Sequence, residues 1–290
     1  MSNPATPRRE QPSTYFVQDR SNEVELGRLQ LQDQMLTTSM GGVLPEQANP
    51  TIFGQVLDVG CGTGGWLMEA AKTYPTMSRL IGVDISARTV EYAQMQAEAQ
   101  QVSDRVQFRI MDALGRLQFP DHSFDLVNQR FGASFLRQWD WDKLLHEYKR
   151  VCKPGGVIRI TEFDVGETSS SPALLRLSDL FVQALYRAGH FFTRDHNGVT
   201  SQLASLLHQQ KLQNVQTHAY TIEYHAGTIQ GQLFVEDIRY LYRTLLPFLH
   251  KWTKVPADYE TIYQQAVAEM QRPDFVATMN LLTTWGSKRD

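Results

Sequence analysis

Short apolar runs alternate along the first half of the chain with segments whose apolar residues recur at helical spacing. Leu67, Ala70, Ala71 and Tyr74, for example, follow the i, i+3, i+4, i+7 pattern of an amphipathic helix. Such an alternation predicts a mainly parallel sheet with helices on both faces. The expected strands are Gln55 to Val59, Leu80 to Val83, Val106 to Ile110, Phe124 to Val127 and Val157 to Phe163.

The pattern changes after Gly166, where helical spacing dominates. We interpret these later helices as a cap that packs on the sheet. The alternative is that they only complete its hydrophobic core. The expected later elements are helices over Leu177–Ala188, Val199–Gln209, Ile238–Leu249 and Tyr259–Met270, with strands at Val215–His218 and Thr221–Tyr224.

Composition narrows the class of protein only a little. The 290 residues are 42% hydrophobic and 20% charged, as in ordinary soluble globular proteins. A net charge of -3 offers no basic footprint, so we expect neither a nucleic-acid nor a membrane partner. No run approaches the roughly 20 apolar residues that span a bilayer, and Met1 to Pro12 lacks the apolar core of a signal peptide.

The chain contains two cysteines, Cys61 and Cys152. Two cysteines cannot build a disulfide framework, and no Cys/His spacing indicates a zinc site. We therefore expect a reducing, cytoplasmic setting and no bound metal.

The strongest chemical signal is the stretch Asp58-Val59-Gly60-Cys61-Gly62-Thr63-Gly64-Gly65, which leaves one expected strand and opens one expected helix. Glycine permits a sharp turn and lets a ligand approach more closely than a Cβ allows. The start of the helix adds free N–H groups and a positive dipole end. Such a loop can hold a nucleotide-like ligand or the carboxylate of an amino acid.

Three acids lie near this loop in the expected fold. The loop satisfies the pattern G-x-G-x-x-G, which alone would suit NAD. Asp58 stands before the first glycine, where it would repel a pyrophosphate but suits the amino group of a methionine moiety. Asp84 ends the next strand, where a ribose-binding acid belongs with either cofactor. Asp112 follows the third strand, where a side chain can bond an adenine amino group.

In this combination the chain resembles the class I S-adenosylmethionine (SAM)-dependent methyltransferases, in particular their type 11/12 small-molecule branch. Asp58 to Gly64 matches the glycine motif, Asp84 the ribose acid, and Met111-Asp112-Ala113 the adenine motif. Phe119 to Asp125 is similar to the approach to the fourth strand, and Arg150 to Gly156 to the Pro-Gly-Gly turn before the fifth.

The resemblance covers about Gln55 to Asp164 and implies an α/β, Rossmann-like, seven-stranded and mainly parallel sheet whose last strand is antiparallel. It implies SAM as cofactor, S-adenosylhomocysteine as product, and in-line methyl transfer to O, N or C of a small-molecule acceptor that it does not name. Asp58 would hold the donor's amino group and Asp84 its ribose hydroxyls. The residues implied to hold the donor are Asp58, Gly60, Cys61, Gly62, Asp84, Ile85, Met111, Asp112, Ala113, Asn128 and Gln129.

No residue is assigned as a catalytic base, which is needed only if the acceptor arrives protonated. Arg130 and Glu162 follow the fourth and fifth strands, and Arg130 either holds an acidic acceptor or pairs with Glu162. His190 and His196 are either candidate bases or ordinary surface or core-edge histidines. Tyr15 precedes the first expected helix, in a segment that often folds over the donor as a lid in similar enzymes.

An apolar acceptor pocket would be lined by aromatic residues, although most aromatic residues in any protein belong to the core. Cys61 is expected to be a small filler between glycines, because no base is patterned with it. The aromatic candidates are Phe131, Phe135, Phe191, Phe192, Phe234, Tyr240 and Tyr242.

These expectations divide the chain into six consecutive segments. They are a disordered tail (1–14), an N-terminal helical lid (15–48), the SAM-binding Rossmann-like core (49–168), a helical cap insertion (169–212), the last strands of the core sheet (213–230) and C-terminal helices completing the cap (231–290).

Two other functions stay open. An NAD(P)-dependent oxidoreductase predicts a Tyr-x-x-x-Lys pair or a similar signature, whereas here Tyr148 and Lys149 are adjacent. A non-catalytic SAM-binding protein would keep the glycine loop and both acids. The Asn/Asp-Pro-Pro-Tyr/Phe motif of amino-directed DNA methyltransferases is absent. The sequence leaves the choice between monomer and homodimer open.

Overall fold

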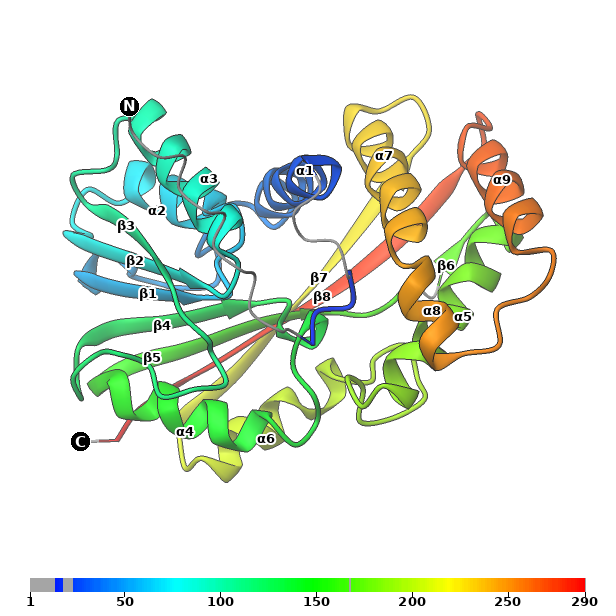
Figure 1. Cartoon of the computed structure of the whole chain (residues 1–290). Helices are drawn as coiled ribbons and strands as arrows, with labels where there is room; N and C mark the ends of the chain where they lie inside the picture. Colours follow the sequence, from blue (N-terminus) through cyan, green and yellow to red (C-terminus); the bar gives the residue numbers. More distant parts are fainter. Residues whose placement is uncertain (1–13, 18–22, 167, 290) are drawn as a thin grey trace, which may run out of the picture.

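The computed structural model describes residues 14–17, 23–166 and 168–289 of the chain. Within them, eight strands form a single sheet. These strands are β1 (Gln55–Val59), β2 (Arg79–Asp84), β3 (Val106–Ile110), β4 (Phe124–Arg130), β5 (Cys152–Phe163), β6 (Thr168–Ser169), β7 (Gln213–His225) and β8 (Val276–Ser287). The order β3-β2-β1-β4-β5 is parallel throughout, and β8 pairs antiparallel with β5, β6 and β7 (Figure 1).

The central strands are apolar because helices cover both faces of the sheet. Leu57 of β1 lies in register between Ile81 of β2 and Val127 of β4, and none of the three is exposed to solvent. Burial of such side chains supplies most of the favourable free energy of folding. The parallel half of the sheet is therefore a rigid platform for the loops at its carboxyl edge.

Helices α1, α2 and α3 cover one face of the sheet, and α4 and α6 cover the other (Figure 1). Ser86 caps the start of α3 by accepting a hydrogen bond from the Thr89 N–H, as the sequence predicts. The helices are α1 (Glu23–Ser39), α2 (Gly65–Thr73), α3 (Ala87–Ala99), α4 (Trp141–Val151), α5 (Pro172–Arg187), α6 (Leu203–Gln209), α7 (Ile229–Thr244), α8 (Leu246–Trp252) and α9 (Tyr259–Met270), with short 3₁₀ turns η1 (Pro50–Ile52), η2 (Gly132–Ser134) and η3 (Thr200–Gln202).

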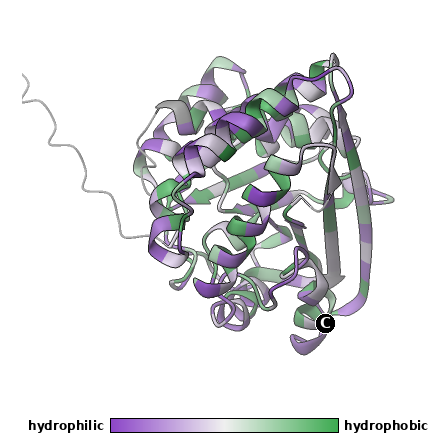
Figure 2. Cartoon of the chain, turned by 90° about the vertical axis from the view of Figure 1, so that its right-hand side faces the viewer, coloured by the Kyte–Doolittle hydropathy of each residue, from purple (hydrophilic) through white to green (hydrophobic). Residues whose placement is uncertain are grey.

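Four helices, α5, α7, α8 and α9, gather at the right-hand end of the molecule in Figure 1. They carry both hydrophobic and hydrophilic residues along their length (Figure 2). The N-terminal α1 packs against α7, so two segments that are far apart in the sequence lie side by side above the sheet (Figure 1). None of the helices among the described residues is long and apolar enough to cross a membrane.

The predicted α/β fold with an antiparallel last strand is confirmed. The expected strands Gln55–Val59 and Val106–Ile110 coincide with β1 and β3. The sheet has one strand more than predicted, because the two-residue β6 adds to the edge of β8.

The prediction that residues 231–290 are helical is wrong for Val276–Ser287, which form β8. Thr and Asn residues interrupt the apolar positions of this segment, so its pattern does not indicate a buried strand. In the structure the Thr283 hydroxyl of this strand finds a partner in the Thr161 hydroxyl of β5, at 2.8 Å. The two short strands expected between residues 215 and 224 are likewise one long strand, β7.

The predicted cap insertion, residues 169–212, is divided between two places. Helix α5 lies with the helices at the far end, whereas α6 packs on the core sheet against β7 and β8, beside α4. Gln210, just after α6, donates to the Asp142 carboxylate of α4 at 2.7 Å. The predicted tail, residues 1–14, lies outside the described residues except for Thr14.

A chain of buried polar side chains crosses three neighbouring strands. Asp58 of β1, Asn128 of β4 and Arg159 of β5 occupy matching register positions. The Asn128 amide donates to Asp58 Oδ1 at 2.8 Å, and its oxygen accepts from Arg159 Nη1 at 2.8 Å. Arg159 Nε then donates to Glu46 Oε1 at 2.7 Å, where both side chains are essentially fully buried. Each member therefore fixes the position of the next.

Glu46 is expected to be important for stability. Burial opposes its ionisation, but the Arg159 guanidinium holds the pKa of this carboxyl below its ordinary value. A depressed carboxyl pKa contributes stability that is present above the unfolded-state pKa and is lost as pH falls through the folded one. Removing Glu46 leaves the Arg159 charge buried without its carboxylate partner.

We therefore predict that Glu46→Ala lowers the free energy of unfolding by about 3 to 5 kcal/mol. Urea unfolding at pH 7 measures this loss. Glu223→Ala on β7 is the matched control, because that side chain is 62% exposed and should change stability by less than about 0.5 kcal/mol. Equal losses in the two variants would contradict the importance of the buried pair.

Candidate functional site

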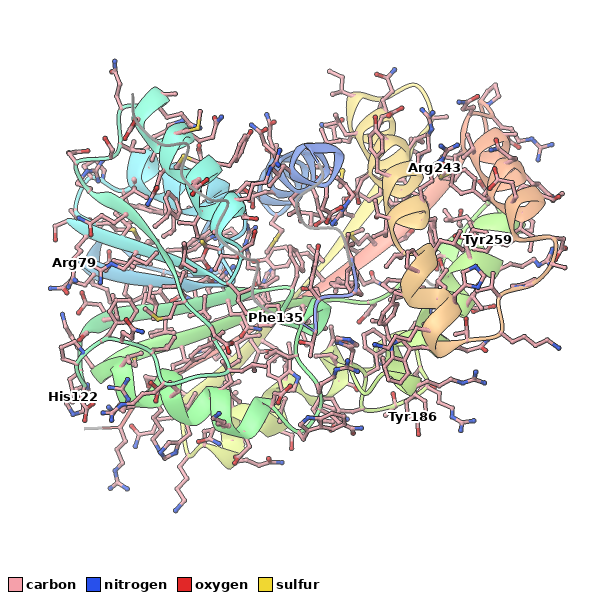
Figure 3. All side chains as sticks on the ribbon, viewed as in Figure 1. Arg79, His122, Phe135, Tyr186, Arg243 and Tyr259 are labelled. Atoms are coloured by element: carbon pink, nitrogen blue, oxygen red, sulfur yellow. The ribbon has the colours of Figure 1, made fainter. Side chains whose placement is uncertain are left out.

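A pocket of about 400 Å³ opens at the carboxyl ends of β1, β2 and β4, where α1 and α7 also contribute to its lining. In Figure 3, Phe135 of this pocket lies near the centre of the molecule. Arg79, which begins β2, and His122, which precedes β4, lie at the opposite end of the sheet (Figure 3). The pocket is thus at the edge where open α/β sheets bind ligands.

The glycine loop forms one wall of the pocket. Gly60, Gly62 and Gly64 have φ angles of 69°, 54° and 77°. This left-handed region is rarely adopted by residues that carry a side chain. The N–H groups of Gly60 and Cys61 donate to the Val83 carbonyl at 2.8 and 3.0 Å, which ties the loop to the end of β2. The loop is therefore held open by its backbone, with its curve facing the pocket.

Two glycines of this loop differ in what their missing side chain provides. A Cβ on Gly64 would collide with the ring of Phe108, so this glycine is needed for packing. A Cβ on Gly62 would meet no protein atom within 4 Å, so this glycine instead leaves open space on the pocket side. The loop is a cradle in which a ligand can approach the backbone closely.

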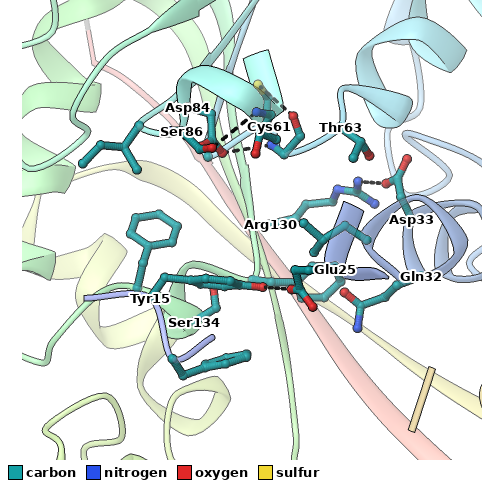
Figure 4. Close-up of a pocket in the computed structure, with 18 of the residues that line it drawn as sticks. Tyr15, Glu25, Gln32, Asp33, Cys61, Thr63, Asp84, Ser86, Arg130 and Ser134 are labelled. Atoms are coloured by element: carbon teal, nitrogen blue, oxygen red, sulfur yellow. Dashed lines mark hydrogen bonds and ion pairs between the residues drawn. The ribbon is translucent and has the colours of Figure 1, made fainter. Parts of the chain in front are cut away.

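Asp84 lies at the carboxyl end of β2 and orders two backbone segments. Its carboxylate accepts from the Gly62 N–H at 3.2 Å and from the Ser86 N–H at 2.9 Å (Figure 4). Asp112 follows β3 and accepts from the Leu114 N–H at 2.9 Å. Both acids line the same pocket, as predicted from the alternation of strands and helices.

Asp58 is the most deeply buried acid at the glycine loop. Desolvation raises its pKa to about 7, and this rise is opposed by the charge of Arg130 and by the hydrogen bond from Asn128. A carboxyl group with such a pKa is incompletely ionised near neutral pH. A cationic group placed beside it would stabilise its charged form.

A second polar cluster lies on the side of the pocket away from the loop. The Tyr15 hydroxyl donates to Glu25 Oε1 at 2.9 Å (Figure 4). Arg28 bonds Glu25 through two nitrogens, at 2.7 and 2.8 Å, and Asp237 of α7 at 3.0 Å. Gln32 Nε2 donates to the other Asp237 oxygen at 3.3 Å. This cluster joins the N-terminal segment, α1 and α7 across more than 200 residues of sequence.

Arg130, at the end of β4, extends between the two sides. Its guanidinium forms an ion pair with Asp33 of α1 (Figure 4) and donates to the Thr37 hydroxyl at 3.2 Å. The expected alternative pairing of Arg130 with Glu162 does not form. This arginine already has a carboxylate partner inside the pocket.

Most of the predicted donor residues lie around this single pocket. Tyr15 and Arg130, two of the candidate catalytic residues, line it as well. Cys61 is part of the wall, and burial raises the pKa of its thiol well above the ordinary value, in keeping with a filler role. The predicted donor residues that line the pocket are Asp58, Gly60, Cys61, Gly62, Asp84, Ile85, Met111, Asp112 and Ala113.

Asn128 and Gln129, two further predicted donor residues, are not part of the pocket lining. Both are fully buried within β4. Asn128 acts through Asp58, which it holds by a hydrogen bond. Gln129 accepts from the Tyr148 hydroxyl of α4 at 2.6 Å, on the other side of the sheet. Residues at the end of a strand alternate between faces, and this alternation separates the two amides.

Glu162, His190 and His196 are also absent from the pocket lining, so the structure gives no support to them as bases. Glu162 lies within β5, where desolvation raises its pKa to about 8 and the Ala133 N–H donates to it at 3.1 Å. Burial lowers the pKa of His190 to about 4, and its Nδ1 lies 2.8 Å from the Leu136 carbonyl oxygen. The ring of His196 bonds the backbone carbonyl of residue 165. Each of the three bonds a backbone group of a neighbouring segment.

Of the aromatic candidates, Phe131 and Phe135 line the pocket. Tyr240 is 39% exposed at the surface of α7. The others pack in or against the hydrophobic core away from the pocket, and they are Phe191, Phe192, Phe234 and Tyr242.

Sequence reasoning missed the polar residues of α1. Glu25, Arg28, Gln32 and Asp33 recur at intervals that place them on one helical face, and all four line the pocket. A polar stripe beside leucines was the signal available for them. Asp237 carries no such signal, because only the packing of α7 against α1 brings it to the site.

Comparison with known proteins gives consistent results. Residues 56–156 match the family model of a methyltransferase domain. The chain is 43% identical over 100 residues to demethylmenaquinone methyltransferase of Lactiplantibacillus plantarum, an alignment that covers 34% of this chain and 41% of that protein. It is 38% identical over 105 residues to ajmaline N-methyltransferase of Rauvolfia serpentina, covering 36% and 34%. The chain thus spans less than half the length of these two curated relatives.

The fold is also similar to that of a solved structure, phosphoethanolamine N-methyltransferase 2 of Haemonchus contortus in complex with phosphomonomethylethanolamine and S-adenosylhomocysteine. The TM-score is 0.58 at 17% identity, over 95% of this chain and 60% of that one. The glycine loop, the acids that follow three successive strands and the matched domain lead to the same assignment. Residues 56–156 of this chain thus match a methyltransferase domain, and the described chain has a Rossmann-like methyltransferase fold.

Proposed function

We propose that this protein transfers a methyl group from SAM to O, N or C of a small-molecule acceptor. The observation that carries the proposal is the convergence of Asp58, Asp84 and Asp112 on one pocket around an open glycine loop. The methyltransferase activity named for the two curated relatives supports it.

The residues of the loop side fit this donor. The buried Asp58 carboxyl suits the ammonium of the methionine moiety, because desolvation makes it favour a nearby cation. Asp84 offers acceptor oxygens suited to ribose hydroxyls, and Asp112 with Ala113 suits the adenine edge. The open space at Gly62 leaves room for the ligand against the backbone. These three acids together offer the acceptor oxygens that suit a positively charged nucleoside such as SAM.

When bound, SAM supplies an activated methyl group, because its positively charged sulfur leaves as a neutral thioether. The bond from sulfur to the methyl carbon breaks as the bond from that carbon to the acceptor forms. The protein's part is to hold the acceptor in line and exclude water, and positioning of this kind contributes much of the rate. If the acceptor carries a proton on the attacking atom, that proton leaves to a carboxylate or to solvent.

Tyr15 is proposed as a positioning residue of this pocket. Burial, together with the Glu25 carboxylate, raises the pKa of its phenol well above the ordinary value. The hydroxyl therefore stays protonated at neutral pH and acts as a hydrogen-bonding group. The segment that carries Tyr15, with α1 and α7, is proposed to cover the bound ligands, because all three contribute to the pocket lining.

We also infer a reducing, cytoplasmic setting. Cys61 and Cys152 are both free thiols in the structure. Neither is paired with the other, as expected for a protein that does not depend on disulfides.

We predict that Asp84→Ala weakens SAM binding by at least tenfold. The variant loses both the proposed ribose acceptor and the bonds that order the Gly62 and Ser86 backbone. Calorimetric titration with SAM measures the affinity. Asp104→Ala is the control, because that carboxylate is 72% exposed before β3 and outside the pocket. Unchanged binding in Asp84→Ala would remove Asp84 from the donor site.

The raised pKa of Asp58 predicts a pH dependence of SAM binding. Protonated Asp58 cannot hold an ammonium group, so affinity should rise about tenfold per pH unit below a pKa of about 7 and level off above it. Titrations between pH 5.5 and 8 measure the profile. In Asp58→Asn the affinity should be lower and nearly independent of pH. A flat wild-type profile would contradict the proposed contact.

For the protein without ligand, the pH dependence of stability that Asp58 contributes has the opposite sign to that of a carboxyl whose pKa is lowered by folding. A carboxyl whose folded pKa is raised contributes stability below its unfolded pKa, and this contribution is lost as pH rises through about 7. SAM binding and intrinsic stability should therefore respond to pH in opposite directions in this range.

A further inference from the structure

The acceptor side of the pocket is mostly apolar. Aromatic and aliphatic side chains from the residue after β4 and from β5, α5, α7 and β8 form this part of the lining. They are Phe131, Phe163, Phe181, Ile238, Leu241 and Met279. Such a surface favours an acceptor with a sizeable apolar body.

At its polar end two carboxylates share one guanidinium. Arg28 is 3.0 Å from Asp237 and 2.7 Å from Glu25, and all three side chains are at least 98% buried. The Tyr15 hydroxyl and the Gln32 amide, which also donate to these acids, are neutral. One positive charge between two negative ones therefore leaves a net negative charge in a desolvated place, which is unfavourable unless a further cation or donor is supplied. Burial raises the pKa of Asp237 despite the nearby Arg28, which is the response expected of an incompletely compensated acid.

No cation among the described lining residues is available for an anionic ligand. The lining contains two guanidinium groups and neither lysine nor histidine. Arg28 is held by Glu25 and Asp237, and Arg130 by Asp33. Phosphate or carboxylate recognition generally requires an arginine fork or a lysine facing the ligand.

The overall charge of the pocket lining also disfavours an anionic ligand. Six carboxyl groups, from Glu25, Asp33, Asp58, Asp84, Asp112 and Asp237, stand against two guanidinium groups among the described residues. Charges in a cleft with low-dielectric walls act strongly on whatever enters it. A ligand that brings a further negative charge is therefore repelled, whereas a cation or a neutral hydrogen-bond donor is favoured.

We propose that the acceptor of this protein is an apolar molecule whose polar group is a neutral hydroxyl or an amine, recognised by the Glu25–Arg28–Asp237 cluster, and that phosphorylated or carboxylated acceptors are excluded. This inference rests on the proposed methyl transfer and specifies its substrate class. It separates this pocket from that of the Haemonchus contortus protein, whose solved complex contains a phosphomonoester.

The test uses three probes with one apolar chain and different head groups, which are n-octylamine, n-octanol and n-octanoate. Each is titrated calorimetrically, below its micelle concentration, into the full-length protein saturated with S-adenosylhomocysteine. The amine and the alcohol are expected to bind at least tenfold more tightly than the carboxylate. Octanoate binding as tight as either of the others would overturn the proposal.

Two variants connect the preference to the cluster. Asp237→Asn and Glu25→Gln should each weaken octylamine binding about tenfold while changing octanol binding less than threefold. Glu236→Gln is the matched control, because that neighbouring side chain of α7 is 43% exposed and pairs with Arg239. Equal loss of amine and alcohol binding would show a structural role only and would contradict recognition by charge.

The outcomes also separate this inference from the proposed function. If S-adenosylhomocysteine binds but neither octylamine nor octanol does, the acceptor class is wrong and the donor site stands. If S-adenosylhomocysteine itself does not bind, the proposed function fails. Should one cluster variant not fold, as judged by its thermal unfolding, the wild-type probe series and the other variant still decide the question.

Discussion

The hydrogen-bonded register of Asp58, Asn128 and Arg159 connects the proposed donor site to the centre of the sheet. Asp58 is a buried acid whose ionised form is unfavourable. The Asn128 amide fixes its position and is itself bonded by Arg159, which forms a buried ion pair with Glu46. Because the strands are parallel, all three side chains are presented in line across β1, β4 and β5. A defect anywhere in this chain is therefore expected to alter the electrostatics of the glycine loop.

The pocket is assembled from three separate parts of the chain. The glycine loop and the acids after β2 and β3 are fixed by the buried parallel strands. Tyr15 and α1 come from the N-terminal part of the chain, and Asp237 comes from α7 near the other end. The Arg28 ion pairs hold these two parts together over the pocket. In the proposed function the core positions the donor, while the elements around it determine which acceptor fits.

The sequence predicts the glycine loop and its neighbouring acids at one pocket because their signals are local. Glycines at positive φ, an acid at a strand end and the Ser86 cap each follow from a few neighbouring residues. Strand β8 and the acceptor side are different. The polar residues of β8 become favourable only between β5 and β7, and Asp237 meets Arg28 only after α7 packs against α1. Asn128 and Gln129 bond groups on opposite faces of the sheet because a one-residue step along β4 changes the face.

A comparison of ligand affinities decides whether the glycine loop with its three acids holds SAM or a dinucleotide. The purified protein is titrated by calorimetry with S-adenosylhomocysteine and, separately, with NAD and NADP. The account predicts one site per chain with micromolar affinity for S-adenosylhomocysteine and no measurable binding of either nicotinamide cofactor. Binding of NAD or NADP without S-adenosylhomocysteine would contradict it.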